Sequence, residues 1–72
     1  MVVRNDDRPG VIGRVGTVLG DAGVNIADMD VGRADRPGTA VMLIAPTGEV
    51  SDTVLEALRA APGIISVDVL RG

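Results

Sequence analysis

The sequence lacks cysteine, histidine and lysine, and it contains no Phe, Tyr or Trp. Without Cys and His, the soft metal ligands and the commonest catalytic bases and nucleophiles are missing, and without Lys no Schiff base can form. We therefore expect no catalytic residue, no metal site and no cofactor in this segment. The chain is interpreted as a binding or regulatory domain and not as an enzyme.

Basic charge is also scarce, because ten acidic residues outnumber seven Arg residues and the formal net charge is -3. Nucleic-acid binding needs a clustered basic surface, and single-stranded sites commonly stack bases on aromatic rings. No apolar run approaches the roughly 18 to 20 residues that span a bilayer, and the N-terminal residues do not resemble a signal sequence. We expect neither nucleic acid nor a membrane as partner, and the lack of Cys favours a cytoplasmic location.

The length predicts a single domain over residues 1–72. A domain of this size lies near the lower limit at which a hydrophobic core is stable alone. Small domains usually gain support from disulfides, a metal or a partner subunit, and the missing Cys and His leave only the partner. We therefore expect association with a second copy.

The first part of the chain predicts a strand, a helix and a second strand. An apolar start over 1–5 runs into a polar loop, and Pro9 is expected in the first turn of the helix. Alternation with a period of two predicts the second strand over 24–33. The apolar stripe of the helix, which stops before Gly23, is formed by Val11, Ile12, Val15, Val18, Leu19 and Ala22.

The segment 36–45 predicts a hairpin. Pro37 and Gly38 occupy the central positions that a type II turn favours, and the segment 40–45 that follows is apolar on both faces. We therefore expect strands 24–33 and 40–45 to pair.

The last third predicts a helix and a final strand. Ser51 is a suitable N-cap, and Asp52 follows it in the positively polarised first turn. A stripe of Val54, Leu55, Leu58 and Ala61 ends at Pro62-Gly63, and the β-branched tail 64–70 predicts a strand.

This βαββαβ order predicts an α+β, ferredoxin-like fold, in which a four-stranded antiparallel sheet carries two helices on one face. The other face then exposes apolar residues of strand 40–45, and at least one edge strand has unpaired backbone groups. We therefore predict a homodimer formed through the sheet edge, the open face or both, with strand 24–33 as the edge.

Polar residues gather where the first strand meets the first helix. A free amino acid needs N–H donors for its carboxylate, which a helix N-terminus supplies, and an acceptor for its ammonium group, which Asp7 or an Asn oxygen supplies. This pattern favours an amino-acid site, although turn formation and helix capping explain the same residues and that interpretation stays open. The candidate ligand-binding residues are Asn5, Asp7, Pro9, Gly10, Val11, Ile12 and Asn25.

Two other patterns each have two interpretations. Asp28 and Asp30 lie on one face of a predicted strand, where they either bind a hard cation or, as edge charges usually do, discourage wrong strand pairing. Gly13, Gly16 and Gly20 form a stripe on the first helix, which indicates close packing against protein or an approach route for a ligand or partner backbone.

Three segments resemble the ACT domain family: NDDRPGVIG at 5–13, GVNIA at 23–27 and PGI at 62–64. The resemblance covers nearly the whole chain. It points first to the carboxy-terminal ACT domains of D-3-phosphoglycerate dehydrogenases, and second to the ACT domains of iron-sulfur L-serine dehydratases. It implies that this chain is a fragment of such a dehydrogenase, an oxidoreductase of L-serine biosynthesis.

In the serine-responsive family two ACT domains pair side by side into one sheet. Serine, the feedback inhibitor, lies between the first loop of one subunit and the second strand of the other. The resemblance therefore implies allosteric control by serine at a dimer interface, with contacts from Asn5, Asp7 and Asn25. Asn5 departs from the family, which has a His or another polar residue there, and Asn is shorter than His and does not titrate.

Two alternatives remain beside serine sensing. The chain is either a dimerisation module without a live ligand site or, on the same fold, an acylphosphatase-type enzyme. The latter would use Arg8 or Arg14 to hold phosphate and an Asn to orient water.

Overall fold

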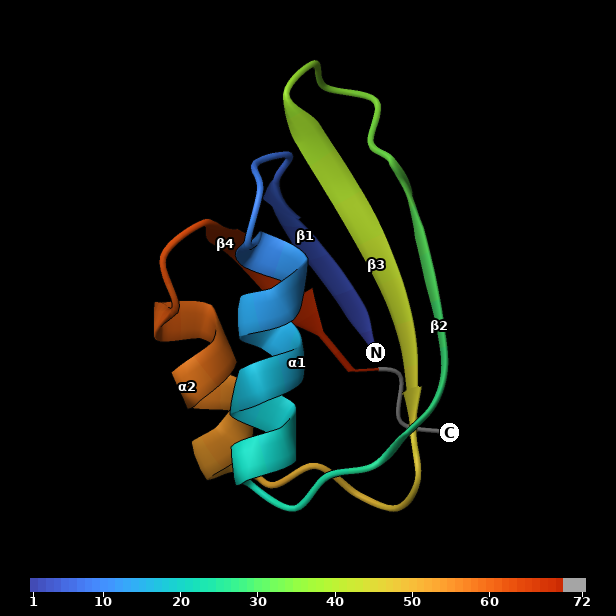
Figure 1. The fold of residues 1–72 in the computed structure, drawn as a ribbon, viewed down its shortest axis with the longest axis vertical. Coiled ribbons are helices and arrows are strands. Elements are labelled where there is room, and N and C mark those ends of the chain that lie inside the picture. Colours follow the sequence, from blue (N-terminus) through green and yellow to red (C-terminus); the bar gives the residue numbers. More distant parts are fainter. Residues whose placement is uncertain (70–72) are drawn as a thin grey trace.

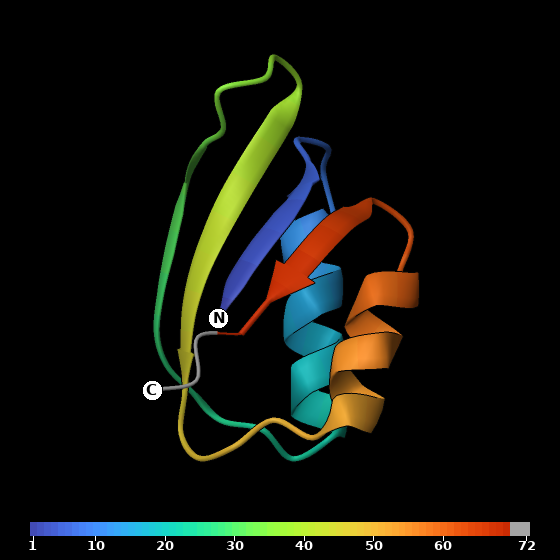
Figure 2. The ribbon, with the colours of Figure 1, turned by 180° about the vertical axis from the view of Figure 1, so that it is seen from behind.

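A computed structural model describes residues 1–69 as a four-stranded sheet with two helices on one face (Figure 1). The same arrangement is seen from behind in Figure 2. The sheet is antiparallel, with the strand order β2-β3-β1-β4. The ferredoxin-like prediction is confirmed. The elements are β1 Val2–Asp6, α1 Val11–Asp21, β2 Ile26–Arg33, β3 Thr39–Pro46, α2 Asp52–Ala60 and β4 Ile64–Asp68.

The apolar stripe of α1 faces the sheet as predicted, and its buried residues are Val11, Val15 and Leu19. Ile12 lies outside this stripe and is 41% exposed. The position predicted for Pro9 was wrong, because α1 begins at Val11 and Pro9 lies in the preceding turn. Gly10 is the N-cap, and its φ of 90° lies in the left-handed region that glycine tolerates. The helix therefore begins two residues after Pro9.

Strands β2 and β3 form the predicted hairpin, and their register pairs Asp30 with Leu43. The turn between them has Gly38 at a φ of 78°, as a type II turn requires. The Thr39 amide closes the turn by donating to the Arg36 carbonyl at 3.2 Å. Both the pairing and the turn type are confirmed.

The hydrophobic core lies between the helices and the sheet. Leu19 of α1 and Leu58 of α2 are fully buried there against β1 and β3 residues such as Val3 and Met42. Leu19 and Leu58 belong to the helical stripes that the periodicity predicted to face inward, whereas the sequence assigned no face to Val3 or Met42. The eight buried residues of the cluster are Val3, Val15, Leu19, Met42, Ile44, Leu55, Leu58 and Val67.

Strand β2 is the uncovered edge of the sheet, as predicted (Figure 1). Its helix-side residues Met29 and Val31 are 38% and 46% exposed, because neither helix reaches over this strand. On the open face Leu43 is 52% exposed. The edge and the open face thus keep the apolar surface that motivated the dimer prediction. Leu70, predicted at the end of the last strand, lies outside the described residues.

Ser51 caps α2, and removing its hydroxyl is expected to destabilise the domain modestly. Its side chain accepts a long hydrogen bond of 3.4 Å from the Val54 amide. We therefore expect Ser51→Ala to lower the free energy of unfolding by about 0.5–1 kcal/mol, in the lower part of the range for N-caps. Thr17→Ala is the matched control, because its hydroxyl bonds a carbonyl within α1 and caps nothing. Urea denaturation that showed equal losses would contradict this capping role.

Candidate functional site

The connection between β1 and α1 brings most of the predicted ligand residues together. Asn5 is the last inward-facing residue of β1, and Gly10 is the N-cap of α1. The residues between them form the loop that turns from the sheet into the helix. Asp7, Pro9 and Gly10 are all exposed on this loop. A ligand therefore has access to the loop and to the start of the helix.

Asn5 is the one buried polar residue of the described chain, with 1% of its surface exposed. Its Nδ2 donates to the Asp6 carbonyl at 2.8 Å. Its Oδ1 is buried and has no hydrogen-bond partner among the described residues. A buried acceptor without a partner costs roughly 1–3 kcal/mol, so native proteins rarely keep one without a use. Asn5 therefore keeps one acceptor that no described residue satisfies.

The N-terminus of α1 follows the loop that begins after Asn5, and it has no side chain capping it. No acidic residue occupies the first turn, so the positive end of the helix dipole is not neutralised there. Of the three amides predicted to donate, that of Val11 is already directed at the Arg8 carbonyl, at 3.4 Å. Ile12 is left better placed than Val11 to bind an anion. A carboxylate at this helix end is favoured by both the dipole and the amides.

The loop is hydrogen-bonded to the β2–β3 turn on one side, and an ion pair joins two of its own side chains. The Asp7 amide donates to the Gly38 carbonyl at 2.9 Å. Arg8 forms an ion pair with Asp6 at 3.3 Å, between side chains that are 62% and 44% exposed. Within residues 1–69 the Asp7 carboxylate has no ion pair of its own. Asp7 is thus the carboxylate of this loop that remains for a ligand ammonium group.

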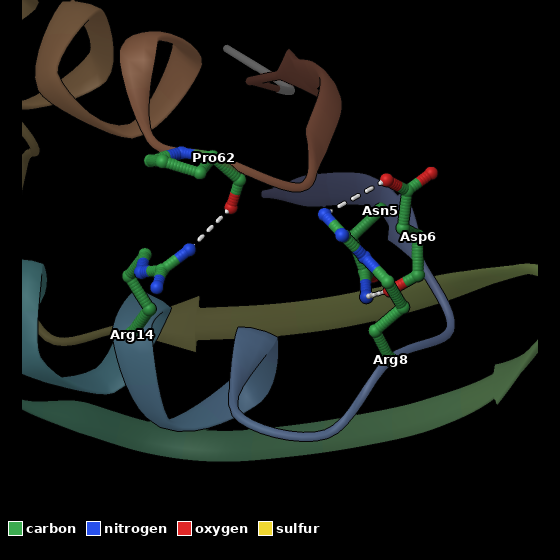
Figure 3. A network of polar contacts seen from close by, with 5 residues as sticks. All are labelled: Asn5, Asp6, Arg8, Arg14 and Pro62. Carbon is green, nitrogen blue, oxygen red and sulfur yellow. Dashed lines mark hydrogen bonds and ion pairs between the residues drawn. The ribbon is translucent and has the colours of Figure 1, made fainter.

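On its other side the loop packs against the Pro62-Gly63 turn between α2 and β4 (Figure 3). The Asp6 amide donates to the Gly63 carbonyl at 2.8 Å. Arg14 donates through Nη1 to the Pro62 carbonyl, also at 2.8 Å. The sequence indicated a turn at Pro62-Gly63, but it did not indicate that this turn contacts the loop and α1. The bond from Arg14 to Pro62, for example, joins residues that are 48 positions apart. The turn is therefore the part of the site that sequence reasoning missed.

Asn25 is exposed and lies at the far end of α1 from Asn5. The eleven residues of α1 separate them, which corresponds to roughly 16 Å of helix. The Asn25 carbonyl accepts from the Thr47 amide at 2.9 Å and from its hydroxyl at 3.2 Å, so the side chain stays available. Asn25 and Asn5 of one chain cannot contact the same small ligand.

The alternative sites have less support from the geometry. Asp28 and Asp30 share the open face of β2, and among residues 1–69 no group of three potential metal ligands forms. A Cβ on Gly13, Gly16 or Gly20 would meet nothing within 4 Å, so close packing within the chain does not explain this stripe. A phosphate site on Arg8 and Arg14 would have to displace their bonds to Asp6 and Pro62. No helix in the described part of the chain is long and apolar enough to cross a membrane.

Comparison with known proteins places these features in a family context. The model of the ACT domain family matches residues 1–63. A D-3-phosphoglycerate dehydrogenase of Bacillus subtilis is 40% identical over 68 residues, which cover 94% of this chain and 13% of that protein. That of Methanocaldococcus jannaschii is 44% identical over 69 residues, covering 96% of this chain and 13% of the relative.

A solved structure, the small subunit of acetolactate synthase from Thermotoga maritima, shares the fold with a TM-score of 0.73. It is 22% identical, and the match covers 90% of this chain and 42% of that one. The chain thus spans only about an eighth of the length of the dehydrogenases that it matches.

Proposed function

Because this chain belongs to the ACT domain family, a family of regulatory domains, we propose that it binds L-serine between two copies of itself. We further propose that it thereby controls an attached D-3-phosphoglycerate dehydrogenase in the cytoplasm. The dehydrogenase relatives at 40% and 44% identity support this choice over a serine dehydratase. The chain matches only 13% of the length of these relatives, so its attachment to a catalytic domain is itself proposed.

The observation that carries the proposal is the buried Oδ1 of Asn5, which has no partner among residues 1–69, in the segment that leads into an uncapped helix. Nδ2 of Asn5 is already engaged by the Asp6 carbonyl. Asn5 therefore offers a ligand only an acceptor, and the ligand must bring a donor. A hydroxyl or an ammonium group meets this requirement, and an aliphatic side chain does not.

Serine has a group for each part of the site. Its carboxylate is directed to the first-turn amides of α1, with Ile12 as the leading donor. Its ammonium group pairs with the free carboxylate of Asp7, and its hydroxyl donates to Asn5 Oδ1. Glycine and alanine lack the third group and would leave the buried acceptor unpaired. We therefore expect both to bind more weakly than serine.

The second half of the site comes from a neighbouring copy, because Asn25 of the same chain is too far away. The register places Asn5 in one row with Ala40 and Arg33, at the end of β2. If β2 pairs antiparallel with β2 of a second copy, the start of the second strand lies beside Arg33. Asn25 of that copy is then about three strand spacings from Asn5, or roughly 14 Å. In this proposal a bound amino acid occupies part of this span.

Control of the enzyme follows from the shared ligand. Serine that touches both copies favours the arrangement in which the two halves of the site meet, so it strengthens the dimer, and the dimer strengthens serine binding equally. The exposed Met29 and Val31 on β2 supply apolar surface for this contact. The attached catalytic domains would respond to the dimer arrangement that serine favours, and the ACT domain itself would catalyse no reaction.

Mixing two inactive variants tests the shared site. Asn5→Ala removes the acceptor of one half, and Asn25→Ala removes the contribution of the other. Each variant alone is expected to bind serine at least tenfold more weakly, because each loses a hydrogen bond to a polar ligand. In an equimolar mixture, half of the dimers are mixed, and each mixed dimer has one intact site. Calorimetry should therefore recover tight binding at about a quarter of the wild-type number of sites.

The controls separate this proposal from its rivals. Glycine and D-serine, titrated in parallel, report whether the hydroxyl and its position are recognised. Tight serine binding by a chain that stays monomeric would contradict the shared site. A stable dimer that binds no amino acid would instead identify the chain as a dimerisation module. Recovery of no binding in the mixture would show that Asn5 and Asn25 do not meet across an interface.

A further inference from the structure

We propose that Arg14, acting through the Pro62-Gly63 turn, is a positioning residue that holds the Asn5 acceptor and the first turn of α1 in their receptive arrangement. The inference rests on the proposed function for the identity of the ligand, and on the contacts of this chain for everything else. Arg14 is the fourth residue of α1, and its side chain lies away from Asn5 (Figure 3). Its effect on a ligand must therefore pass through other residues.

Three hydrogen bonds, joined by the backbone of Pro62-Gly63 and of Asp6, connect Arg14 to Asn5. Arg14 Nη1 donates to the Pro62 carbonyl at 2.8 Å. The next carbonyl, that of Gly63, accepts from the Asp6 amide at 2.8 Å. The Asp6 carbonyl in turn accepts from Asn5 Nδ2 at 2.8 Å, which leaves Oδ1 as the atom without a partner. The orientation of the Asn5 amide is thus set by a backbone segment that Arg14 helps to hold.

The same turn also packs on the first residue of the helix. A Cβ on Gly63 would lie 2.8 Å from Val11 Cγ2 and 3.4 Å from Arg8 Nη2. The absence of a side chain at Gly63 is therefore what lets the turn sit against the start of α1. Movement of the turn away from Arg14 would disturb both Asp6, whose carbonyl accepts from Asn5, and Val11 at the start of α1, because Asp6 and Val11 contact the turn.

Two backbone bonds join the loop to distant segments within residues 1–69. One is the bond from Asp6 to Gly63, and the other is that from Asp7 to Gly38, on the side of the β2–β3 turn. Gly10 and Gly63 both have a φ of 90° and lack side chains that would stiffen the backbone. Arg14 provides a side-chain bond that ties α1 directly to the turn. This gives an exposed arginine an influence on the site that its own exposure would not suggest.

Arg14→Met tests the proposal, because it removes the donor and keeps an unbranched side chain. Arg59→Met is the matched control: Arg59 also donates from a helix to a backbone carbonyl, that of Val67, at 2.9 Å, and it lies outside the loop. We expect Arg14→Met to weaken serine binding about tenfold, as the loss of one hydrogen bond would. Arg59→Met should leave the affinity within about twofold.

The decisive readout uses the protein without ligand. In ¹⁵N-resolved NMR spectra, Arg14→Met is expected to shift or broaden the side-chain amide of Asn5 and the backbone amide of Ile12. Arg59→Met should leave both signals in place. Arg14→Lys should restore them at least in part, because only one N–H of the guanidinium is used. If Arg14 had only a structural role, Arg14→Met and Arg59→Met would lower the thermal stability equally. The Asn5 and Ile12 signals would then not respond to Arg14→Met in particular.

The outcomes separate this inference from the proposed function. If the wild type binds no serine, the proposed function fails, while the NMR comparison still decides the role of Arg14. If Arg14→Met and Arg59→Met leave the Asn5 and Ile12 signals equally unchanged, the positioning role is overturned. It is also overturned if the affinity loss disappears at high salt and the spectra without ligand are unaltered, because Arg14 would then act only through its charge.

Discussion

Replacing Asn5 by Leu is expected to abolish serine binding while leaving the free energy of unfolding unchanged or about 1 kcal/mol higher. Asn5 is 1% exposed, and its Oδ1 has no partner among the described residues. Leu has nearly the same shape and removes this unsatisfied acceptor. The Asp6 carbonyl loses the Asn5 donor but still accepts from the Arg8 amide at 2.9 Å, so the substitution leaves this carbonyl with a hydrogen-bond partner. A residue kept for binding and not for folding behaves in this way.

Two measurements check this prediction. Calorimetry should show serine affinity reduced by at least about a hundredfold, because both the hydroxyl contact and the polar lining of the site are gone. Urea denaturation should show a midpoint equal to or above that of the wild type. A loss of about 2 kcal/mol or more would identify Asn5 as a structural residue and would remove the main support for a ligand site.

Replacing Gly63 by Ala is expected to lower the free energy of unfolding by about 2–5 kcal/mol, the largest effect of any single methyl addition in the turns. Two costs combine. The φ of 90° lies in the region where a side chain costs about 1–2 kcal/mol. The new Cβ would also lie 2.8 Å from Val11 Cγ2, and overpacking of this kind costs about 1–3 kcal/mol.

Gly48→Ala is the matched control for this substitution. Its φ is 87°, and nothing lies within 4 Å of its Cβ, so it should lose only the conformational part, about 1–2 kcal/mol. Adding Val11→Ala to Gly63→Ala removes the clashing methyl group, so the second substitution should cost less than it does in the wild type. Thermal or urea unfolding of the four variants gives the comparison. Equal losses for Gly48→Ala and Gly63→Ala would show that the turn does not press on α1.

Much of the architecture is determined by local sequence patterns. The stripe of Val11, Val15 and Leu19 predicted a helix, because burial of one face imposes the helical period. The alternation over 24–33 predicted a strand, which forms although neither of its faces is buried within the described residues. Ser51 and the Pro37-Gly38 pair marked a helix start and a turn through backbone chemistry that acts within a few residues. Local rules failed at Pro9, where a left-handed Gly10 delays the start of α1.

The candidate site divides along the same line. The residue types that suit an amino acid lie in one short segment, which contains Asn5, Asp7 and the start of α1. They could be recognised from the sequence because a predicted helix start also predicts where its free amide donors lie. Only the tertiary structure decided that Asn5 is buried with one acceptor that no residue of 1–69 satisfies, and that the Pro62-Gly63 turn contacts the loop. It also decided that Asn25 lies at the opposite end of the helix. These facts depend on strand order and register, which bring residues from distant parts of the chain together through packing that no local pattern encodes.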